Sequence, residues 1–359
     1  MDTTIRESKL SQRLTDAIRQ TAPGTALRLA LDMIIAGHLG ALICIGDTDS
    51  VLAAGDDGFK LDISFTANRL FELSKMDGAI VVDKDLTRIL RTNYHLNPDP
   101  TLPTSETGMR HRTAARMSLL TRATVISVSE RRSVITLYVD GRGHQVRPVS
   151  ELMASVNQLL VSMQNSRQQL DRSLLRLTTL ELDNYVTLED VADTLYLFEV
   201  LMTEAESLDR IILQLGYEGR TIQMQRDEFT GDMDGKYTLM IRDYAANSSD
   251  ESAKAIRRAL HDTNNTKLRS AKYIGELLGY EGKSEDSTIH PLGLRTLSNV
   301  SVVRRGMADK IVDEYGSLSG LMDDIEQNPD RHPDRLDDLG VDNPTILADS
   351  LYRMWGKRT

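Results

Sequence analysis

The first 147 residues alternate between short apolar runs and segments with helical spacing. Apolar runs bounded by turn signals predict buried strands, and apolar residues three or four positions apart predict helices that pack on a sheet. The predicted strands are residues 41–45, 78–82, 124–128 and 133–139, and the predicted helices are residues 26–38 and 67–75. Strands interleaved with helices favour an α/β domain with a mixed or parallel sheet that helices cover on both faces.

A long helical pattern follows this domain. Residues 151–184 contain neither glycine nor proline, and their large apolar side chains follow a spacing of four and three residues. This spacing predicts one helix of about 50 Å. Its apolar stripe needs a partner, either in a coiled coil with another chain or within a helical spine. Residues 188–215 continue the helical pattern, whereas residues 217–235 are polar, rich in turn formers and give no assignment.

The C-terminal part predicts a compact module of short helices at residues 292–297, 307–315, 318–325 and 346–355. The pairs Asn328-Pro329, His332-Pro333 and Asn343-Pro344 lie between these segments and indicate tight turns. A length of 359 residues favours two or three domains. The pattern therefore divides the chain into residues 1–147, 148–285 and 286–359.

Composition narrows the possible functions. The formal net charge of −10 argues against a globally basic DNA-binding protein but allows a local basic patch. Aromatic residues make up 5% of the chain, which disfavours stacking platforms for single-stranded nucleic acid. The only cysteine, Cys44, lies in an apolar run, so we expect it in the core; it excludes a disulfide within the chain and a cysteine-based zinc site. A polar N-terminus and the lack of an apolar stretch of about 20 residues predict a cytoplasmic protein without a membrane span.

Two short polar motifs carry the candidate chemistry. Asp77 and Gly78 open a predicted strand, and a carboxylate at a strand edge can hold a divalent metal. Residues 110–113, of sequence Arg-His-Arg-Thr, begin a helical segment after Gly108, and a basic helix start can hold phosphates. Together these motifs indicate chemistry on a nucleotide. The alternative is an Asp-Gly turn and an exposed basic helix start, and the residues alone leave both interpretations open.

Four motifs in order make the chain similar to a known family. They are APGT at residues 22–25, KMDGA at residues 75–79, NPDP at residues 97–100 and ETGMRHRTA at residues 106–114. With these motifs the chain resembles the diadenylate cyclase family, most strongly over residues 20–147. The three-part layout is similar to members in which an α/β cyclase domain precedes a helical spine and a helix-hairpin-helix domain. The resemblance therefore implies these three domains at residues 1–147, 148–285 and 286–359.

The resemblance also implies an activity. Family members condense two ATP molecules into cyclic di-AMP and two pyrophosphates with Mg²⁺ or Mn²⁺, and each 3′-hydroxyl attacks the partner α-phosphate across a face-to-face subunit interface. A homo-octamer is the assembly that the resemblance implies. Asp77 would be the catalytic and metal-binding carboxylate. The implied nucleotide-binding residues are Gly78, Leu96, Thr107, Gly108, Met109, Arg110, His111, Arg112, Thr113 and Ser129.

Two positions depart from the cyclase motifs of the family. Met109 stands where the family usually has threonine, so one side-chain hydroxyl is lost while a backbone contact survives. Ala115 replaces a usual glutamate in the helix after the motif. We expect the activity to persist.

The C-terminal module departs further. A helix-hairpin-helix binds DNA phosphate through backbone N–H groups of a Gly-x-Gly hairpin, and here Asp338 stands at the first glycine while Gly340 keeps the second. Residues 286–359 hold nine Lys or Arg against thirteen Asp or Glu. The candidate contacts to branched or damaged DNA are Arg304, Arg305 and Gly340. An alternative function is a DNA-binding scaffold or sensor whose nucleotide site regulates without catalysis.

Overall fold

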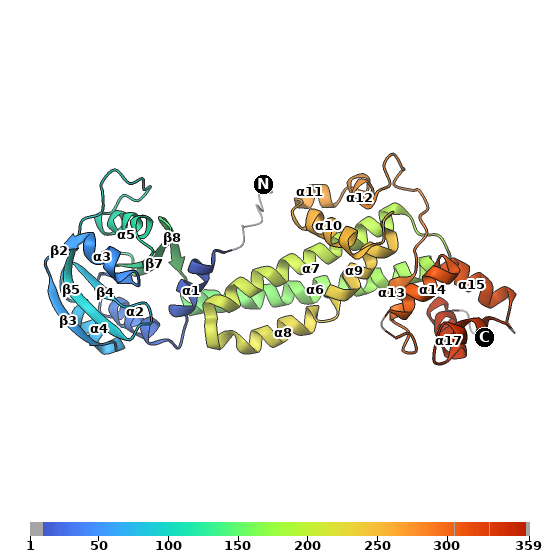
Figure 1. Ribbon diagram of the computed structural model, residues 1–359, viewed down its shortest axis with the longest axis horizontal. Coiled ribbons are helices and arrows are strands. Elements are labelled where there is room, and N and C mark those ends of the chain that lie inside the picture. Colours follow the sequence, from blue (N-terminus) through green and yellow to red (C-terminus); the bar gives the residue numbers. More distant parts are fainter. Residues whose placement is uncertain (1–9, 305, 330, 357–359) are drawn as a thin grey trace. The chain divides into compact units, whose positions relative to one another are not determined.

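The computed structural model describes residues 10–304, 306–329 and 331–356. Contacts between Cα atoms group the chain into two compact units (Figure 1). Of the described residues, 10–158 and 208–224 form one unit, and 159–207 and those from 225 onward form the other. The predicted boundaries at residues 147/148 and 285/286 are not boundaries between these units, and the three-part division stays a prediction.

The first unit is built on a mixed sheet of eight strands. The strand order is β2-β5-β4-β1-β6-β7-β8, and β3 also pairs with β5. β1 and β4 are parallel, and the other pairings are antiparallel. The strands are β1 (Ala41–Ile45), β2 (Gly55–Asp56), β3 (Phe59–Ser64), β4 (Ala79–Val82), β5 (Arg88–Leu96), β6 (Thr124–Ser129), β7 (Val134–Val139) and β8 (Arg142–Val146). The prediction of a mixed sheet is confirmed.

Helices cover both faces of this sheet (Figure 1). The helices α1 (Gln12–Gln20), α2 (Ala26–Ala36) and α4 (Ala67–Leu73) pack on one face, and α3 (Thr48–Ala53) and α5 (Met109–Leu120) pack on the other. Because side chains of a strand alternate between faces, Ile43 of β1 belongs to the first core and Cys44 to the second. Burial raises the pKa of the Cys44 thiol to about 12, and the prediction of a core cysteine is confirmed.

Two long helices, α6 (Val149–Leu182) and α7 (Leu188–Leu215), follow the sheet. They lie side by side where Ser162 donates a hydrogen bond to Glu204 and where Ser173 and Thr194 share one (Figure 1). The stripe of α6 is buried: the exposed fraction of Leu152, Val156, Met163, Leu170 and Leu177 is at most 1%. The prediction of one long helix is therefore confirmed, and its stripe packs within the chain.

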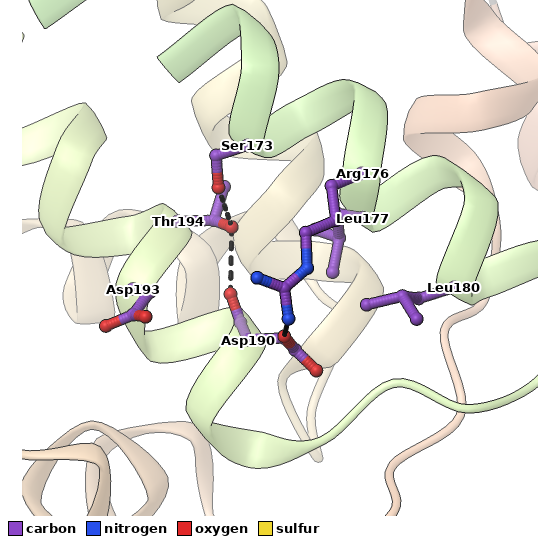
Figure 2. Close-up of a pocket in the computed structure, with 7 residues that line it drawn as sticks. All are labelled: Ser173, Arg176, Leu177, Leu180, Asp190, Asp193 and Thr194. Carbon is purple, nitrogen blue, oxygen red and sulfur yellow. Dashed lines mark hydrogen bonds and ion pairs between the residues drawn. The ribbon is translucent and has the colours of Figure 1, made fainter. Parts of the chain in front are cut away.

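A small polar hollow opens between α6 and α7 (Figure 2). Arg176 Nη2 lies 2.9 Å from Asp190 Oδ1, and the Thr194 hydroxyl donates to the Asp190 carbonyl at 2.8 Å. The hollow has a volume of about 40 Å³. Such a volume suits a water molecule, whereas a nucleotide needs a pocket of about 300 Å³ or more. The hollow is therefore too small to be a nucleotide site.

The rest of the described chain is helical. The elements are η1 (Gly216–Gly219), α8 (Arg220–Thr230), α9 (Met233–Tyr244), α10 (Asp250–His261), α11 (Asn265–Leu268), α12 (Ala271–Leu278), α13 (Leu294–Ser298), α14 (Met307–Tyr315), α15 (Leu318–Gln327), α16 (His332–Asp338) and α17 (Pro344–Trp355). α13, α14, α15 and α17 confirm the four predicted short helices. The expected turn at His332-Pro333 is instead the start of α16, because proline is well tolerated in the first turn of a helix.

Across the described residues, each helix is too short or too polar to cross a bilayer.

Candidate active site

The sheet topology brings the predicted site residues to one end of the sheet. β1 and β4 run parallel, so the residues before each strand lie at the same end. β6 runs antiparallel to β1 with Val128 opposite Ala41, and β5 runs antiparallel to β4 with Tyr94 opposite Ala79. The last residues of β5 and β6 therefore reach this end as well. It gathers Asp77, Gly78, Leu96 and Ser129.

A tight turn holds Asp77 at this end. Gly78 has a φ of +84°, and a Cβ added there would lie 2.8 Å from the carbonyl carbon of Asn93. Only glycine fits this backbone without strain. The side-chain amide of Asn93 donates to the backbone carbonyl of Asp77 at 2.8 Å. The turn is thus fixed to β5, while the Asp77 side chain itself is exposed.

The first turn of α5 forms a cationic helix start. Gly108 is the N-cap and contributes no side-chain hydrogen bond, so N–H groups of the first turn stay available to an anion. Arg110 and Arg112 are exposed, and Met109 is 77% exposed. Positive charge and free N–H groups on one helix start are the features that bind phosphate.

Arg110 connects this helix start to the sheet end that carries Asp77. Its Nη1 donates to the carbonyl of Val128 at 3.4 Å, next to the last residue of β6. A Cβ added at Gly40, the residue before β1, would lie only 2.1 Å from the same nitrogen. The guanidinium therefore rests on Gly40 at the start of β1. The acid and the cationic helix start lie at the same end of the sheet.

The remaining predicted residues surround these two features. Thr107 is exposed in the loop before α5, and Thr113 is half-buried in its second turn. Leu96 is half-buried and packs against the second core. His111 points inward, and its Nδ1 lies 2.8 Å from the Tyr138 hydroxyl.

Several residues of this site escaped the sequence analysis. Gly40 and Asn93 carried no motif, because their roles depend on contacts with Arg110 and Asp77 that the topology creates. Glu106 is the first residue of the motif at residues 106–114, but no role was predicted for it. Tyr138 was predicted only as part of the strand at residues 133–139. A buried tyrosine in an apolar strand is a weak signal, since its hydroxyl needs a partner.

A larger hollow lies at the opposite end of the sheet. It has a volume of about 400 Å³ and reaches the end of β1 at Ile45 and the start of β6 at Thr124. Three cationic side chains and two carboxylates line it, and the Asp47 carboxylate accepts the Arg122 backbone N–H at 2.7 Å. This hydrogen bond is the first cause that lowers the pKa of Asp47. Despite its size, the hollow contains none of the predicted site residues.

Known proteins share both the sequence and its layout. One family model, described as DisA bacterial checkpoint controller nucleotide-binding, matches residues 28–143, and another, the DisA bacterial checkpoint controller linker region, matches residues 146–287. The DNA integrity scanning protein DisA of Corynebacterium glutamicum is 40% identical over 314 residues, which cover 86% of each chain. The chain belongs to the DisA family of diadenylate cyclases. Its resemblance to the cyclase motifs is thereby confirmed.

More distant DisA proteins match over similar lengths. The protein of Carboxydothermus hydrogenoformans is 36% identical over 88% of this chain and 92% of its own. The protein of Acetivibrio thermocellus is 36% identical over 97% of this chain and 96% of its own. The match to DisA thus extends through the helical C-terminal part.

Proposed function

We propose that two copies of this chain meet face to face and condense two ATP molecules into cyclic di-AMP and two pyrophosphates. Each 3′-hydroxyl would attack the α-phosphate of the nucleotide on the partner subunit. One observation supports this most. The Arg110 guanidinium packs on Gly40 and donates a hydrogen bond to the carbonyl of Val128, at the sheet end that carries Asp77. A phosphate clamp and an acid at one end of a sheet suit nucleotidyl transfer.

The phosphate contacts in this proposal come from the first turn of α5. Arg110 and Arg112 carry planar forks that bind phosphate oxygens in pairs. Thr107, Thr113 and Ser129 add hydroxyl donors, whereas Met109 contributes only its backbone N–H. Gly78 and Leu96 would lie against the nucleoside, since backbone can approach closely at a glycine.

Asp77 would carry the divalent metal that the family needs. In the described parts of the chain, no group of three or more His, Cys, Asp or Glu side chains could hold a metal ion. Mg²⁺ is commonly held by one or two carboxylates together with substrate phosphates. The single exposed carboxylate of Asp77 therefore fits a metal that arrives with ATP. When bound, Mg²⁺ or Mn²⁺ supplies positive charge to the phosphates.

The exposure of the site supports the face-to-face arrangement. Asp77, Gly108, Met109, Arg110 and Arg112 are all exposed in a single chain. A second chain would cover them, exclude water and bring the second nucleotide. A closed dimer is the smallest assembly that does this. The homo-octamer implied by the family resemblance stays a prediction.

Replacing Arg110 or Arg112 with alanine is expected to raise the Kd for ATP about 10- to 100-fold, because each change removes charged hydrogen bonds to phosphate. ATP binding can be measured by calorimetry and turnover by chromatography of cyclic di-AMP with Mn²⁺. Arg122→Ala, an exposed arginine at the opposite end of the sheet, is the control and should bind ATP normally. Wild-type affinity in both site variants would remove the phosphate clamp from the proposal.

Replacing Gly40 with alanine tests the contact between Gly40 and the Arg110 guanidinium while Arg110 itself is unchanged. The new methyl group would meet only the end of a flexible side chain, so the fold should survive while the guanidinium moves. We expect the Kd for ATP to rise about tenfold with little change in melting temperature. Gly235→Ala is the control, since a Cβ there meets nothing within 4 Å. An unchanged Kd would show that the contact between Gly40 and Arg110 does not contribute to ATP binding.

Regulation by DNA is a further part of the proposal, supported by the name of the relatives. Residues 339–343 join α16 to α17, and Gly340 has a φ of +90° as a tight hairpin requires. Arg304 forms an ion pair of 2.7 Å with Asp342 of this hairpin, so its charge is partly offset. Arg305 lies outside the described residues. Measuring cyclic di-AMP formation with and without branched DNA tests this regulation.

A further inference from the structure

A buried tyrosine links His111 to a carboxylate. The Tyr138 hydroxyl lies 2.8 Å from His111 Nδ1, and Tyr138 is 1% exposed. Glu106 lies near the same ring: a Cβ added at Gly143 would lie 3.0 Å from Tyr138 Cε1 and 3.3 Å from Glu106 Oε1. The pKa of Tyr138 is raised, first by burial and then by its hydrogen bond to Glu106. The hydroxyl therefore stands between an acid and an imidazole.

The hydrogen-bonding capacities of these groups decide where the protons lie. A carboxylate only accepts hydrogen bonds, so Glu106 takes the single hydroxyl proton of Tyr138. The Tyr138 oxygen must then accept, and the group that faces it is His111 Nδ1. Nδ1 therefore carries a proton. In the neutral ring Nε2 then has a lone pair and no proton, whereas in the imidazolium it has an N–H.

We propose that Glu106 and Tyr138 are positioning residues that keep Nδ1 of His111 protonated and leave Nε2 as the atom that meets the triphosphate. This inference rests on the proposed function, in which the first turn of α5 binds ATP. Because phosphate oxygens only accept hydrogen bonds, His111 held in this way binds them as imidazolium.

Other charged groups lie near His111 in the sequence or on the neighbouring strand, but they do not determine which ring nitrogen carries the proton. Arg110 and Arg112 flank His111 in the first turn of α5. On β8, beside the strand of Tyr138, lie Arg142 and His144, and burial followed by the Arg142 charge lowers the pKa of His144. These groups are present in every variant below, so comparison with the wild type cancels their contribution.

The test is the pH dependence of KM for ATP in Tyr138→Phe and Glu106→Gln. Either change lets the neutral ring place its proton on Nε2, where it can still donate to phosphate. We therefore expect Tyr138→Phe and the wild type to have similar KM values at about pH 6, where both rings carry a proton on Nε2, and the KM of Tyr138→Phe to lie about tenfold below the wild-type value at about pH 9, with kcat changed little. Glu106 is only half-buried, so Glu106→Gln serves if Tyr138→Phe folds poorly.

Two further variants separate the possible outcomes. Tyr237→Phe removes another buried tyrosine hydroxyl that donates to a carboxylate, Glu199, at 2.6 Å, and its KM should follow the wild type at every pH. His111→Gln should raise KM; wild-type KM in that variant would overturn the phosphate role of His111 itself. If His111→Gln raises KM but the ratio of Tyr138→Phe to wild type does not change with pH, the positioning role is wrong while the phosphate clamp stands.

Discussion

Replacing Asp77 with asparagine is expected to lower the rate of cyclic di-AMP formation by about 10²- to 10⁴-fold. The amide keeps the shape of the side chain but loses the negative charge that would hold the metal and draw the proton of the 3′-hydroxyl. The fold should be unaffected, because backbone groups of Asp77 and Gly78 fix the turn while the carboxylate is exposed. Product formation can be followed by chromatography with ATP and Mn²⁺ or Mg²⁺.

The affinity for ATP decides how this result is interpreted. Because the proposed phosphate contacts come from α5, Asp77→Asn should bind ATP within a few-fold of the wild type while turning it over poorly. Asp85→Asn changes another exposed aspartate, in the turn after β4 at the opposite end of the sheet, and should keep full activity. Normal turnover in Asp77→Asn would contradict a catalytic carboxylate. Retained ATP binding with no product in the wild type would instead favour a regulatory nucleotide site.

The strands that could be predicted are those buried on both faces. β1, β4, β6 and β7 are short apolar runs between turn signals, and the structure contains them within about a residue of the predicted bounds. β5 was missed because its sequence is polar and irregular: the register shifts twice along its pairing with β4, and Asn93 has a positive φ. Without a period of two, nothing local indicates a strand.

The candidate site divides in the same way. Asp77 and Arg110 belong to short motifs, so both could be predicted from the sequence. The residues that hold them are distant in sequence: Tyr138 lies 27 positions from His111, and Gly40 meets Arg110 only once β1 and α5 are packed. Such partners follow from strand register and helix placement, which residue patterns do not specify.

The start of the C-terminal part also depends on distant contacts. The sequence pattern suggested a boundary at residue 286. In the structure, Leu188 donates to the carbonyl of Ser287 at 3.1 Å, and Ile289 donates to that of Val186 at 2.9 Å. These bonds tie the chain after residue 286 to the turn between α6 and α7. A deletion that starts at residue 286 would therefore cut hydrogen bonds inside one compact unit.

A buried ion pair makes this connection costly to break. Arg295 of α13 lies 2.7 Å from Glu181 of α6, and the two side chains are 3% and 0% exposed. The same carboxylate accepts from Tyr244 and Thr296 at 2.6 Å. Nearby, Asp243 accepts backbone N–H groups at the start of α13, and burial followed by the Glu181 charge raises the pKa of Asp243 to about 7. Arg295 thus supplies the positive charge that offsets the buried carboxyl groups of Glu181 and Asp243.

Replacing Arg295 with methionine is expected to destabilise the helical unit by about 3–5 kcal/mol, because Glu181 would be left as an uncompensated buried charge. Trp355 is the only tryptophan of the chain and lies in this unit, where its Nε1 donates to Asp183 at 2.5 Å. Its fluorescence during urea unfolding therefore reports the stability of this unit. The proposed catalytic residue, Asp77, lies in the other unit, so enzymatic activity does not report the stability of the unit that contains Arg295.

The double variant Glu181→Leu with Arg295→Met separates the cost of the unpaired charge from the loss of packing. If the charge dominates, removing both partners should restore most of the stability, since apolar side chains can replace a buried pair at little cost. Equal destabilisation in the single and double variants would mean that the gain from removing the Glu181 charge is cancelled by the loss of its hydrogen bonds to Tyr244 and Thr296. Because the two acids and Arg295 come from α6, α9 and α13, either result identifies what holds these three helices together.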